Sequence, residues 1–468
     1  MRIRILLFIW AFSLSYSQLA NIDFLKSPHN LTGDHKSNDL SVCRACHLSD
    51  KSNEFINVNP SQFCLSCHDG SVGNSFNRQS SIQSIHSMDL FYHNYQMNEN
   101  IPYDLPLRDK MITCITCHDP HDNSKGQFLR LEKSQLCMSC HPDQNLELSA
   151  HKHSFSMIKD LAREIECQTC HDIHLISQYN HLLVKEENQL CIGCHDGIKN
   201  NDQEIASVDN ITITLGKLYT HVGPIVNSST MGMARVSCSD CHNSHTVSDK
   251  PNGFLPGALI GSSGISKFGN SISVSTHEYE ICYKCHGFNS NPIFTSNIAA
   301  KFNGLNKSSH PIERYSNNLN AKMSLRQNYQ KVGFINCSDC HGNDNALGIK
   351  GPHGSKYKGI LKSNYSQSPF TTVNISEDNS LCFTCHDFTF IVESGGFRWH
   401  KIHIENGGYN CVGCHDAHGS QSLPSLLNFN RSFIDQNQNG EKLFTQLGSG
   451  SGSCSLTCHG HIHQNQSY

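Results

Sequence analysis

The sequence predicts a chain that is mostly irregular, with short helices and little strand, packed around bound groups rather than around a large apolar core of its own. Three observations support this fold class. Hydrophobic residues make up only 37% of the chain, and charged residues only 16%. The pattern Cys-x-x-Cys-His recurs along most of the length. Few stretches keep the periodicity of a helix or a strand.

The repeated pattern is organised in doublets. The stretch from Cys114 to His141 holds two Cys-x-x-Cys-His units, and six such doublets follow one another. Eleven units are strict, whereas the unit from Cys454 to His459 has one extra residue between its cysteines. The twelve cysteine pairs are Cys43 and Cys46, Cys64 and Cys67, Cys114 and Cys117, Cys137 and Cys140, Cys167 and Cys170, Cys191 and Cys194, Cys238 and Cys241, Cys282 and Cys285, Cys337 and Cys340, Cys382 and Cys385, Cys411 and Cys414, and Cys454 and Cys458.

This unit is the attachment signature of c-type haem. The two thiols add to the vinyl groups of the porphyrin, and the adjacent imidazole binds the iron as its proximal ligand. A disulfide framework or a zinc ribbon also uses cysteine pairs, but neither demands a histidine after every second cysteine. We therefore expect twelve haem c groups, with iron bound by His47, His68, His118, His141, His171, His195, His242, His286, His341, His386, His415 and His459.

Each iron also needs a second axial ligand, and nineteen of the 31 histidines remain after the twelve proximal ones are removed. Four units continue as Cys-His-x-x-His, which makes His121, His174, His245 and His418 candidates. The loops supply His29 or His35, His86 or His93, His151 or His153, His221, His310, His353, and His400 or His403. This set is one short of twelve, and His461, His463 or the second histidine of a pair would complete it. Iron with two imidazoles has no open position, so it exchanges electrons and binds no substrate.

The N-terminus predicts export. Arg2 and Arg4 precede a short apolar run, Ile5 to Phe12, so that residues 1–17 read as a signal peptide with cleavage near Gln18. We expect an extracellular or cell-surface protein, or alternatively a periplasmic one. Residues 18–42 read as an extended arm, 43–200 as doublets one to three, and 201–468 as doublets four to six.

A few local elements can be predicted. Met157, Leu161 and Ile165 recur on one face, which predicts a helix over 156–166. The alternation in 208–218 predicts a strand and a boundary between the two halves. The Gly/Ser-rich stretch 257–273 reads as loop. His181 reads as a surface or packing residue, and no β-domain is expected at the C-terminal end.

The charge balance excludes some partners. Thirty-six basic and 40 acidic residues give no polycation for nucleic acid, and no later apolar run approaches the length of a membrane span.

The doubled spacing, the CHDGSVG segment and the CHDPH-type units resemble bacterial multihaem cytochromes c, a family that includes extracellular cytochromes that polymerise into conductive filaments. The resemblance implies a chain wrapped around a continuous haem stack, in which the second histidine of Cys-His-x-x-His ligates a neighbouring haem. Two departures are the missing second histidine after His47 and the extra residue before Cys458.

The resemblance also implies a secreted dodecahaem protein for long-range electron transfer, not an enzyme. Its partners would be further copies of itself, redox proteins of the periplasm or outer membrane, or extracellular acceptors. The alternatives are a multihaem reductase of nitrogen or sulfur oxyanions, and a periplasmic carrier that serves an outer-membrane conduit.

Overall fold

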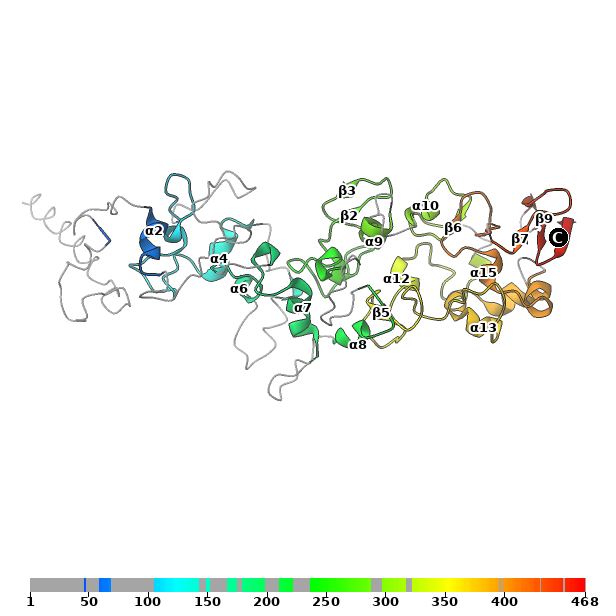
Figure 1. The fold of residues 1–468 in the computed structure, drawn as a ribbon, viewed down its shortest axis with the longest axis horizontal. Helices are drawn as coiled ribbons and strands as arrows, with labels where there is room; N and C mark the ends of the chain where they lie inside the picture. Colours follow the sequence, from blue (N-terminus) through cyan, green and yellow to red (C-terminus); the bar gives the residue numbers. More distant parts are fainter. Residues whose placement is uncertain are drawn as a thin grey trace, which may run out of the picture. The chain divides into compact units, whose positions relative to one another are not determined.

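The fold is seen in a computed structural model (Figure 1). It describes residues 46–47, 59–68, 105–142, 149–151, 166–174, 179–197, 210–221, 236–287, 297–316, 322–394, 397, 399–429, 431–448 and 451–467. The chain divides into two compact units, 1–190 and 191–468. The predicted signal peptide, the arm and the division at 200/201 lie outside the described residues, as does the helix expected over 156–166 apart from its last residue, Glu166.

Short helices surround the cysteine pairs. The first unit of a doublet lies in a one-turn helix that begins at its first cysteine: α3 (Cys114–Cys117), α6 (Cys167–Cys170), η8 (Cys238–Asp240), α12 (Cys337–Cys340) and α15 (Cys411–Cys414). The second unit lies in a helix that begins before the cysteine: α2 (Pro60–Leu65), α4 (Lys133–Met138), α7 (Glu187–His195), α9 (Glu278–His286) and α14 (Ser380–Phe383).

Local hydrogen bonds explain where these helices begin. In α3 the backbone N–H of Thr113 donates to the Thr116 hydroxyl at 3.0 Å. In α12 the N–H of Asn336 donates to Asp339 at 2.8 Å. Both are the return bond of a capping box, which closes the first turn of a helix. A short polar side chain two places after the first cysteine therefore helps these first units to turn, whereas α15 has Gly413 at that place and is capped by the side chain of Asn410, which accepts from the N–H of Cys411.

The other helices connect these turns. They are η7 (Asn180–Leu182), α8 (Thr212–Leu215), η9 (Gly257–Leu259), α10 (Ala299–Phe302), α13 (Ile375–Asp378), η10 (Phe390–Ser394) and η11 (Ile402–Asn406). None of the helices in the described ranges is both long and apolar enough to cross a membrane.

Most strands have only two residues and pair antiparallel. β1 (Tyr219–Thr220) pairs with β5 (Gly354–Ser355), β2 (Gly264–Ile265) with β3 (Ser271–Ile272), and β4 (Ser308–Ser309) with β6 (Gly419–Ser420). Because β1–β5 and β4–β6 join residues more than a hundred positions apart, they fasten distant loops of the second unit to one another.

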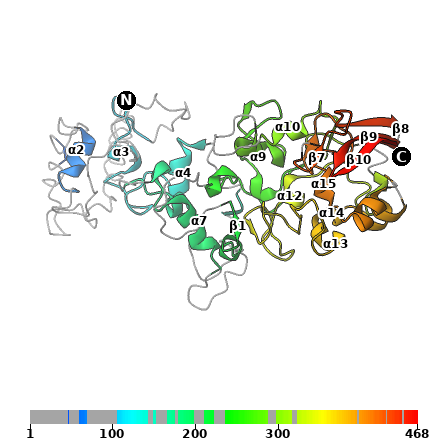
Figure 2. The ribbon, with the colours of Figure 1, turned by 45° about the vertical axis from the view of Figure 1, so that its right-hand side comes forward.

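A larger sheet occupies the C-terminal end. In it β9 (Ser451–Cys458) pairs with β7 (Ile434–Asp435), β8 (Leu443–Gly448) and β10 (His461–Ser467) (Figure 2). The expectation of no β-domain here was therefore wrong. The tight turn at His459 and Gly460 explains the sheet, since a two-residue turn with both φ angles positive favours a hairpin.

The strand expected over 208–218 is also wrong, because its described part forms helix α8. The side chain of Asn210 accepts hydrogen bonds from the backbone N–H and the hydroxyl of Thr212, at 3.0 and 2.7 Å. This Asx turn bends the chain directly before the helix, and here it outweighs the alternating pattern that favoured a strand.

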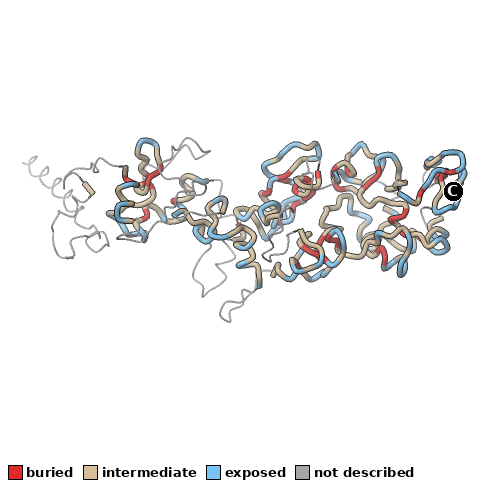
Figure 3. Tube along the Cα trace, in the orientation of Figure 1, coloured by how far each residue is buried: buried red, intermediate tan, exposed pale blue. Residues whose placement is uncertain are grey.

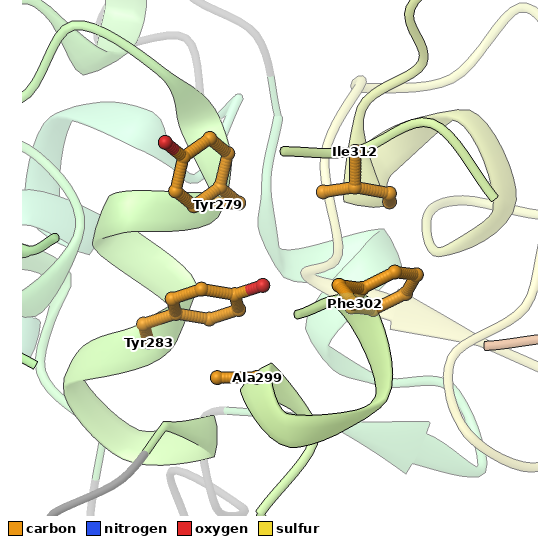
Figure 4. Packing of buried hydrophobic residues seen from close by; sticks show 5 residues of the cluster. All are labelled: Tyr279, Tyr283, Ala299, Phe302 and Ile312. Atoms are coloured by element: carbon orange, nitrogen blue, oxygen red, sulfur yellow. The ribbon is translucent and has the colours of Figure 1, made fainter. Parts of the chain in front are cut away.

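Apolar packing is confined to small clusters, as the short buried stretches in Figure 3 indicate. In the largest, α9 supplies Tyr279 and Tyr283, and α10 supplies Ala299 and Phe302, with Ile312 against them (Figure 4). The Tyr283 hydroxyl donates to Glu313 at 2.6 Å, so its buried polar atom is satisfied. The fold is thus mostly coil with short helices and little strand, as the sequence predicted.

We expect Phe302→Ala to destabilise the second unit by about 3–5 kcal/mol, because Phe302 is only 4% exposed and the change leaves a cavity. Thermal unfolding of the haem-loaded protein, followed by circular dichroism, measures the effect. Phe268→Ala is the matched control: that ring is 78% exposed, so its loss should change stability by less than about 0.5 kcal/mol. Equal effects of the two changes would contradict the assigned core.

Candidate haem-binding sites

The chain returns across the first unit of a doublet and pairs with its histidine. Four such single bridges occur in the described residues: His118 with Leu129, His171 with Leu183, His341 with Leu361, and His415 with Leu427. In all four of these returns the two residues before the leucine both have positive φ, as in Gln127 and Phe128 at 53° and 58°. Such backbone costs energy in residues other than glycine and turns the chain sharply.

This turn directs a backbone carbonyl at the imidazole. The Nδ1–H of His118 donates to the Gln127 carbonyl at 2.9 Å, and that of His341 to Gly359 at 2.7 Å. The same bond joins His171 to His181, His242 to Ala258, and His415 to Ser425. A carbonyl only accepts, so Nδ1 carries the proton and the lone pair of Nε2 is left for a metal.

A second local bond orients the following histidine in Cys-His-x-x-His. The backbone N–H of His121 donates to the Asp119 side chain at 3.0 Å. Equivalent bonds join His174 to Asp172, His245 to Asn243, and His418 to Asp416. The Asp or Asn after the proximal histidine therefore forms a turn that presents the second imidazole.

Within the described ranges, seven proximal histidines face a second imidazole. The ring centroids are 5.7 Å apart for His47 and His121, 5.9 Å for His118 and His174, 5.9 Å for His242 and His353, 6.2 Å for His286 and His221, 6.2 Å for His341 and His418, 6.4 Å for His386 and His310, and 6.3 Å for His415 and His400. An imidazole binds a transition metal at about 2 Å, so two rings on opposite sides of one iron lie about 6 Å apart between centroids. These residues fit the group that the sequence predicts.

Several of the second imidazoles are also fixed by carbonyls. Nδ1–H of His221 donates to Pro352 at 2.8 Å, that of His400 to Ile391 at 3.1 Å, and that of His310 to Ala417. Burial is the main reason that the pKa of His353, His386, His400 and His418 falls to about 4. These rings are therefore neutral, which is the form that binds metals.

For the remaining predicted ligands the structure gives backbone contacts only, or none. His68 and His141 close their turns with N–H bonds to Cys64 at 3.0 Å and Cys137 at 2.9 Å, and His195 is the last residue of α7. The N–H of His151 donates to Ser149 at 3.2 Å. His29, His35, His86, His93 and His153 lie outside the described residues, as does Cys43. The side chain of His181 is exposed, as predicted, although its carbonyl serves His171.

At four junctions between doublets in the described residues, the first cysteine of one unit lies against the first cysteine of the next unit. A thiol hydrogen bond joins Cys64 to Cys114, Cys137 to Cys167, Cys282 to Cys337, and Cys382 to Cys411. The Glu278 carboxylate lies within 4.8 Å of both sulfurs at the third of these junctions, where it accepts from the backbone and hydroxyl of Ser338 at 2.6 Å each. No disulfide bond joins any of the described cysteines.

Within a doublet, the second cysteine of the first unit lies beside a cysteine of the second unit. Burial, followed by the neighbouring Cys140, raises the pKa of Cys117 to about 11. The pKa of Cys241 is raised to about 11 by burial and then by Cys282, and that of Cys340 to about 12 by burial and then by Cys385. Units adjacent in sequence are thus adjacent in space at these junctions.

The unit at the C-terminal end has a different geometry. Cys454 and Cys458 lie in strand β9, not in a helix, and His459 stacks on Phe433 with centroids 4.4 Å apart and planes 9° apart. His403 lies 6.1 Å from His463, the spacing of the seven pairs above.

Comparison with known proteins agrees with these sites. Residues 106–146 and 160–200 match the family of the doubled CXXCH motif, and residues 336–419 match that of cytochrome c554 and c-prime. The chain is a multihaem c-type cytochrome. Its Cys-x-x-Cys-His units bind haem c.

Two relatives are similar to this cytochrome over part of its length. The cytochrome c-type protein NrfB of Haemophilus influenzae is 22% identical over 158 residues, which are 29% of this chain and 65% of the relative. The NrfB of Escherichia coli O6:H1 is 22% identical over 178 residues, which are 35% of this chain and 81% of the relative. The chain thus spans just under two thirds of the Haemophilus protein. No solved structure matches it.

Sequence reasoning missed the returning carbonyls and the Asp or Asn that orients each second histidine. The sequence did hold a signal for the returning carbonyls: a leucine follows the proximal histidine of α3, α6 and α15 by eleven or twelve residues. His463 was named only as one of several ways to complete the ligand set, and its position opposite His403 had no signal in the spacing.

Proposed function

We propose that this cytochrome passes electrons along a single file of twelve haems, each held between two histidines. The observation that supports this best is the order of the cysteine contacts. At the described junctions first cysteines meet between doublets, and the second cysteine of a first unit lies beside the next unit, so these neighbouring attachment sites follow the sequence. Haems attached at such closely spaced sites would be separated by short distances, as electron transfer from one haem to the next requires.

We assign the seven facing imidazole pairs as the axial ligands of seven irons. Bound iron supplies a one-electron couple, and two imidazoles complete its coordination. The protein's part is to hold each ring: a carbonyl on Nδ1 fixes its orientation, and burial keeps it neutral. Because no position is then open to substrate, we infer electron transfer rather than catalysis. A reductase of nitrogen or sulfur oxyanions would need one iron with a free site.

We further infer that residues 1–17 direct export, so that the cytochrome works outside the cytoplasm. At the cell surface its partners would be extracellular acceptors or further copies of itself. In the periplasm it would serve as a carrier to redox proteins there or in the outer membrane.

A count of haem groups and spin states tests the main proposal. We expect an intact mass equal to the chain from about Gln18 plus twelve haems, because twelve cysteine pairs are present. Electron paramagnetic resonance of the oxidised protein should show low-spin iron alone. A high-spin signal worth one haem, together with turnover of nitrite or sulfite, would favour the reductase instead.

Replacing a second histidine tests the ligand pairs. In His418→Met a thioether should replace one imidazole opposite His341, which raises the reduction potential of one haem and leaves the covalent haem count unchanged. Spectroelectrochemical titration measures the shift. The control is His181→Met, which alters an exposed histidine that faces no proximal ring in the described residues and should leave every potential in place. Identical titrations of the two variants would refute the assignment.

We also propose that the arm supplies a ligand to the next subunit. Doublet one lacks its own Cys-His-x-x-His, and the arm holds His29 and His35 in a stretch too polar to form a core. A bond from one subunit to the next is head to tail, so it would generate an open fibre.

Separate His29→Ala and His35→Ala variants test this contact. One of them should abolish polymers seen by electron microscopy and leave one haem per chain high-spin. If the wild-type protein stays monomeric at high concentration with all haems low-spin, the arm binds iron of its own chain and the filament proposal fails.

A further inference from the structure

We propose that the buried carboxylate of Glu278 lowers the reduction potential of the two haems that are attached through Cys282 and Cys337, where doublet four meets doublet five. This inference deepens the proposed function and rests on it, because it takes haems to occupy these two sites and to exchange electrons. It assigns one side chain a role in how readily an electron passes between these doublets.

Glu278 lies between the two attachment sites. It is the first residue of α9, one helical turn before Cys282, while Cys337 is the first residue of α12. In the described ranges this is the only place where a carboxylate oxygen and two attachment sulfurs all lie within 4.8 Å of one another. Because a thioether would join each sulfur directly to a porphyrin, a charge on Glu278 acts on two haems at short range.

The carboxylate is buried and has no close counter-ion. Glu278 is only 5% exposed, and its two oxygens accept from the backbone N–H and the hydroxyl of Ser338 at 2.6 Å each. None of the ion pairs among the described residues includes Glu278. Burial raises the pKa of Glu278, whereas the bonds from Ser338 lower it; of the more distant charges, Asp339 raises this pKa and Lys362 lowers it. The two donated bonds favour the ionised form.

Helix α9 does not need this carboxylate to begin. Glu280 already accepts from the backbone N–H of Thr276 and of His277, at 2.7 and 2.9 Å, which caps the first turn. The side chain of Glu278, in the same turn, bonds across to α12 instead. A buried charge is costly, although the positive end of the helix dipole offsets part of the cost. Its place beside the sulfurs therefore has a reason other than capping.

Two other junctions between doublets are built differently at the same place, four residues before the first cysteine of the second unit. In α4 this residue is Lys133, whose ammonium pairs with Glu166 at 3.3 Å; the two side chains are 40% and 38% exposed, so the charges cancel and face water. In α13 it is Asp378, which accepts from the backbone N–H and the hydroxyl of Thr372 at 2.5 and 2.7 Å. The carboxylate at the junction of doublets four and five thus differs from both.

A negative charge at this place acts on the redox equilibrium of the haem. Ferric haem carries one more positive charge than ferrous haem, so a nearby anion stabilises the oxidised form and lowers the reduction potential. The effect is stronger for a buried anion than for an exposed one, because the interior screens charges less than water does. Two successive haems would therefore hold an electron less readily, and passage between doublets four and five would depend on Glu278.

Glu278→Gln in the exported, haem-loaded protein tests the proposal. The amide has the shape of the carboxylate and still accepts from Ser338, so the change removes the charge and little else. We expect two one-electron steps of the spectroelectrochemical titration to move to higher potential, with the haem count by intact mass unchanged. Asp339→Asn is the matched control: it removes a like charge from the residue after Ser338, but that residue is exposed, so water and salt screen it and the shift should be clearly smaller.

A fully loaded Glu278→Gln protein that titrates like the wild type would overturn the proposal, even if its thermal stability changed, and so would equal shifts in the two variants. If Glu278→Gln attaches fewer haems, the wild-type protein is titrated at neutral and at mildly acidic pH instead. Protonation of Glu278 removes the same charge, so two steps should rise more than the others; a uniform rise would refute the inference. Failure of the proposed function would be visible separately, as missing haem or high-spin iron in the wild-type protein.

Discussion

A backbone carbonyl held against the proximal imidazole is the contact on which the repeated structure depends. It fixes the proton on Nδ1 and so decides which nitrogen is left for iron. To supply it, the chain must come back across the cysteine turn, and that return buries a leucine: Leu129 is 5% exposed and packs with Leu136 of the next unit. One hydrogen bond therefore links the chemistry of a site to the small apolar cluster that positions its neighbour.

Distant parts of the second compact unit, residues 191–468, are joined by polar contacts and imidazole pairs as well as by apolar packing. Lys217 bonds Asp344 at 2.6 Å, and Lys301 bonds Asp416 at 3.0 Å, across more than a hundred residues in each case. On the proposed function the pair of His341 and His418 adds a stronger link, because both rings would bind one metal. In a chain with only 37% hydrophobic residues, such cross-links contribute stability that proteins with larger cores obtain from the burial of apolar side chains.

The attachment sites could be predicted from sequence because their chemistry is local: two thiols and an imidazole within one turn. The position of His121 and His418 opposite other rings was also within reach, since the Cys-His-x-x-His spacing is local too. The pairing of His353 with His242 was not, because it depends on how a long loop folds back. Helix α8 and strand β9 were missed because an Asx turn and a hairpin turn outweighed the sequence pattern.

The two kinds of cysteine contact bear on the route of the electron. A first cysteine meets the preceding or following doublet, whereas a second cysteine faces its partner within the doublet. On the proposed function the two thioethers of one porphyrin would therefore adjoin different neighbours. The file would run through each site from one edge to another and would not branch. At the junctions where these contacts are described the sites follow the sequence, so on the proposed function the order of the cysteines along the chain would set the order of the steps there.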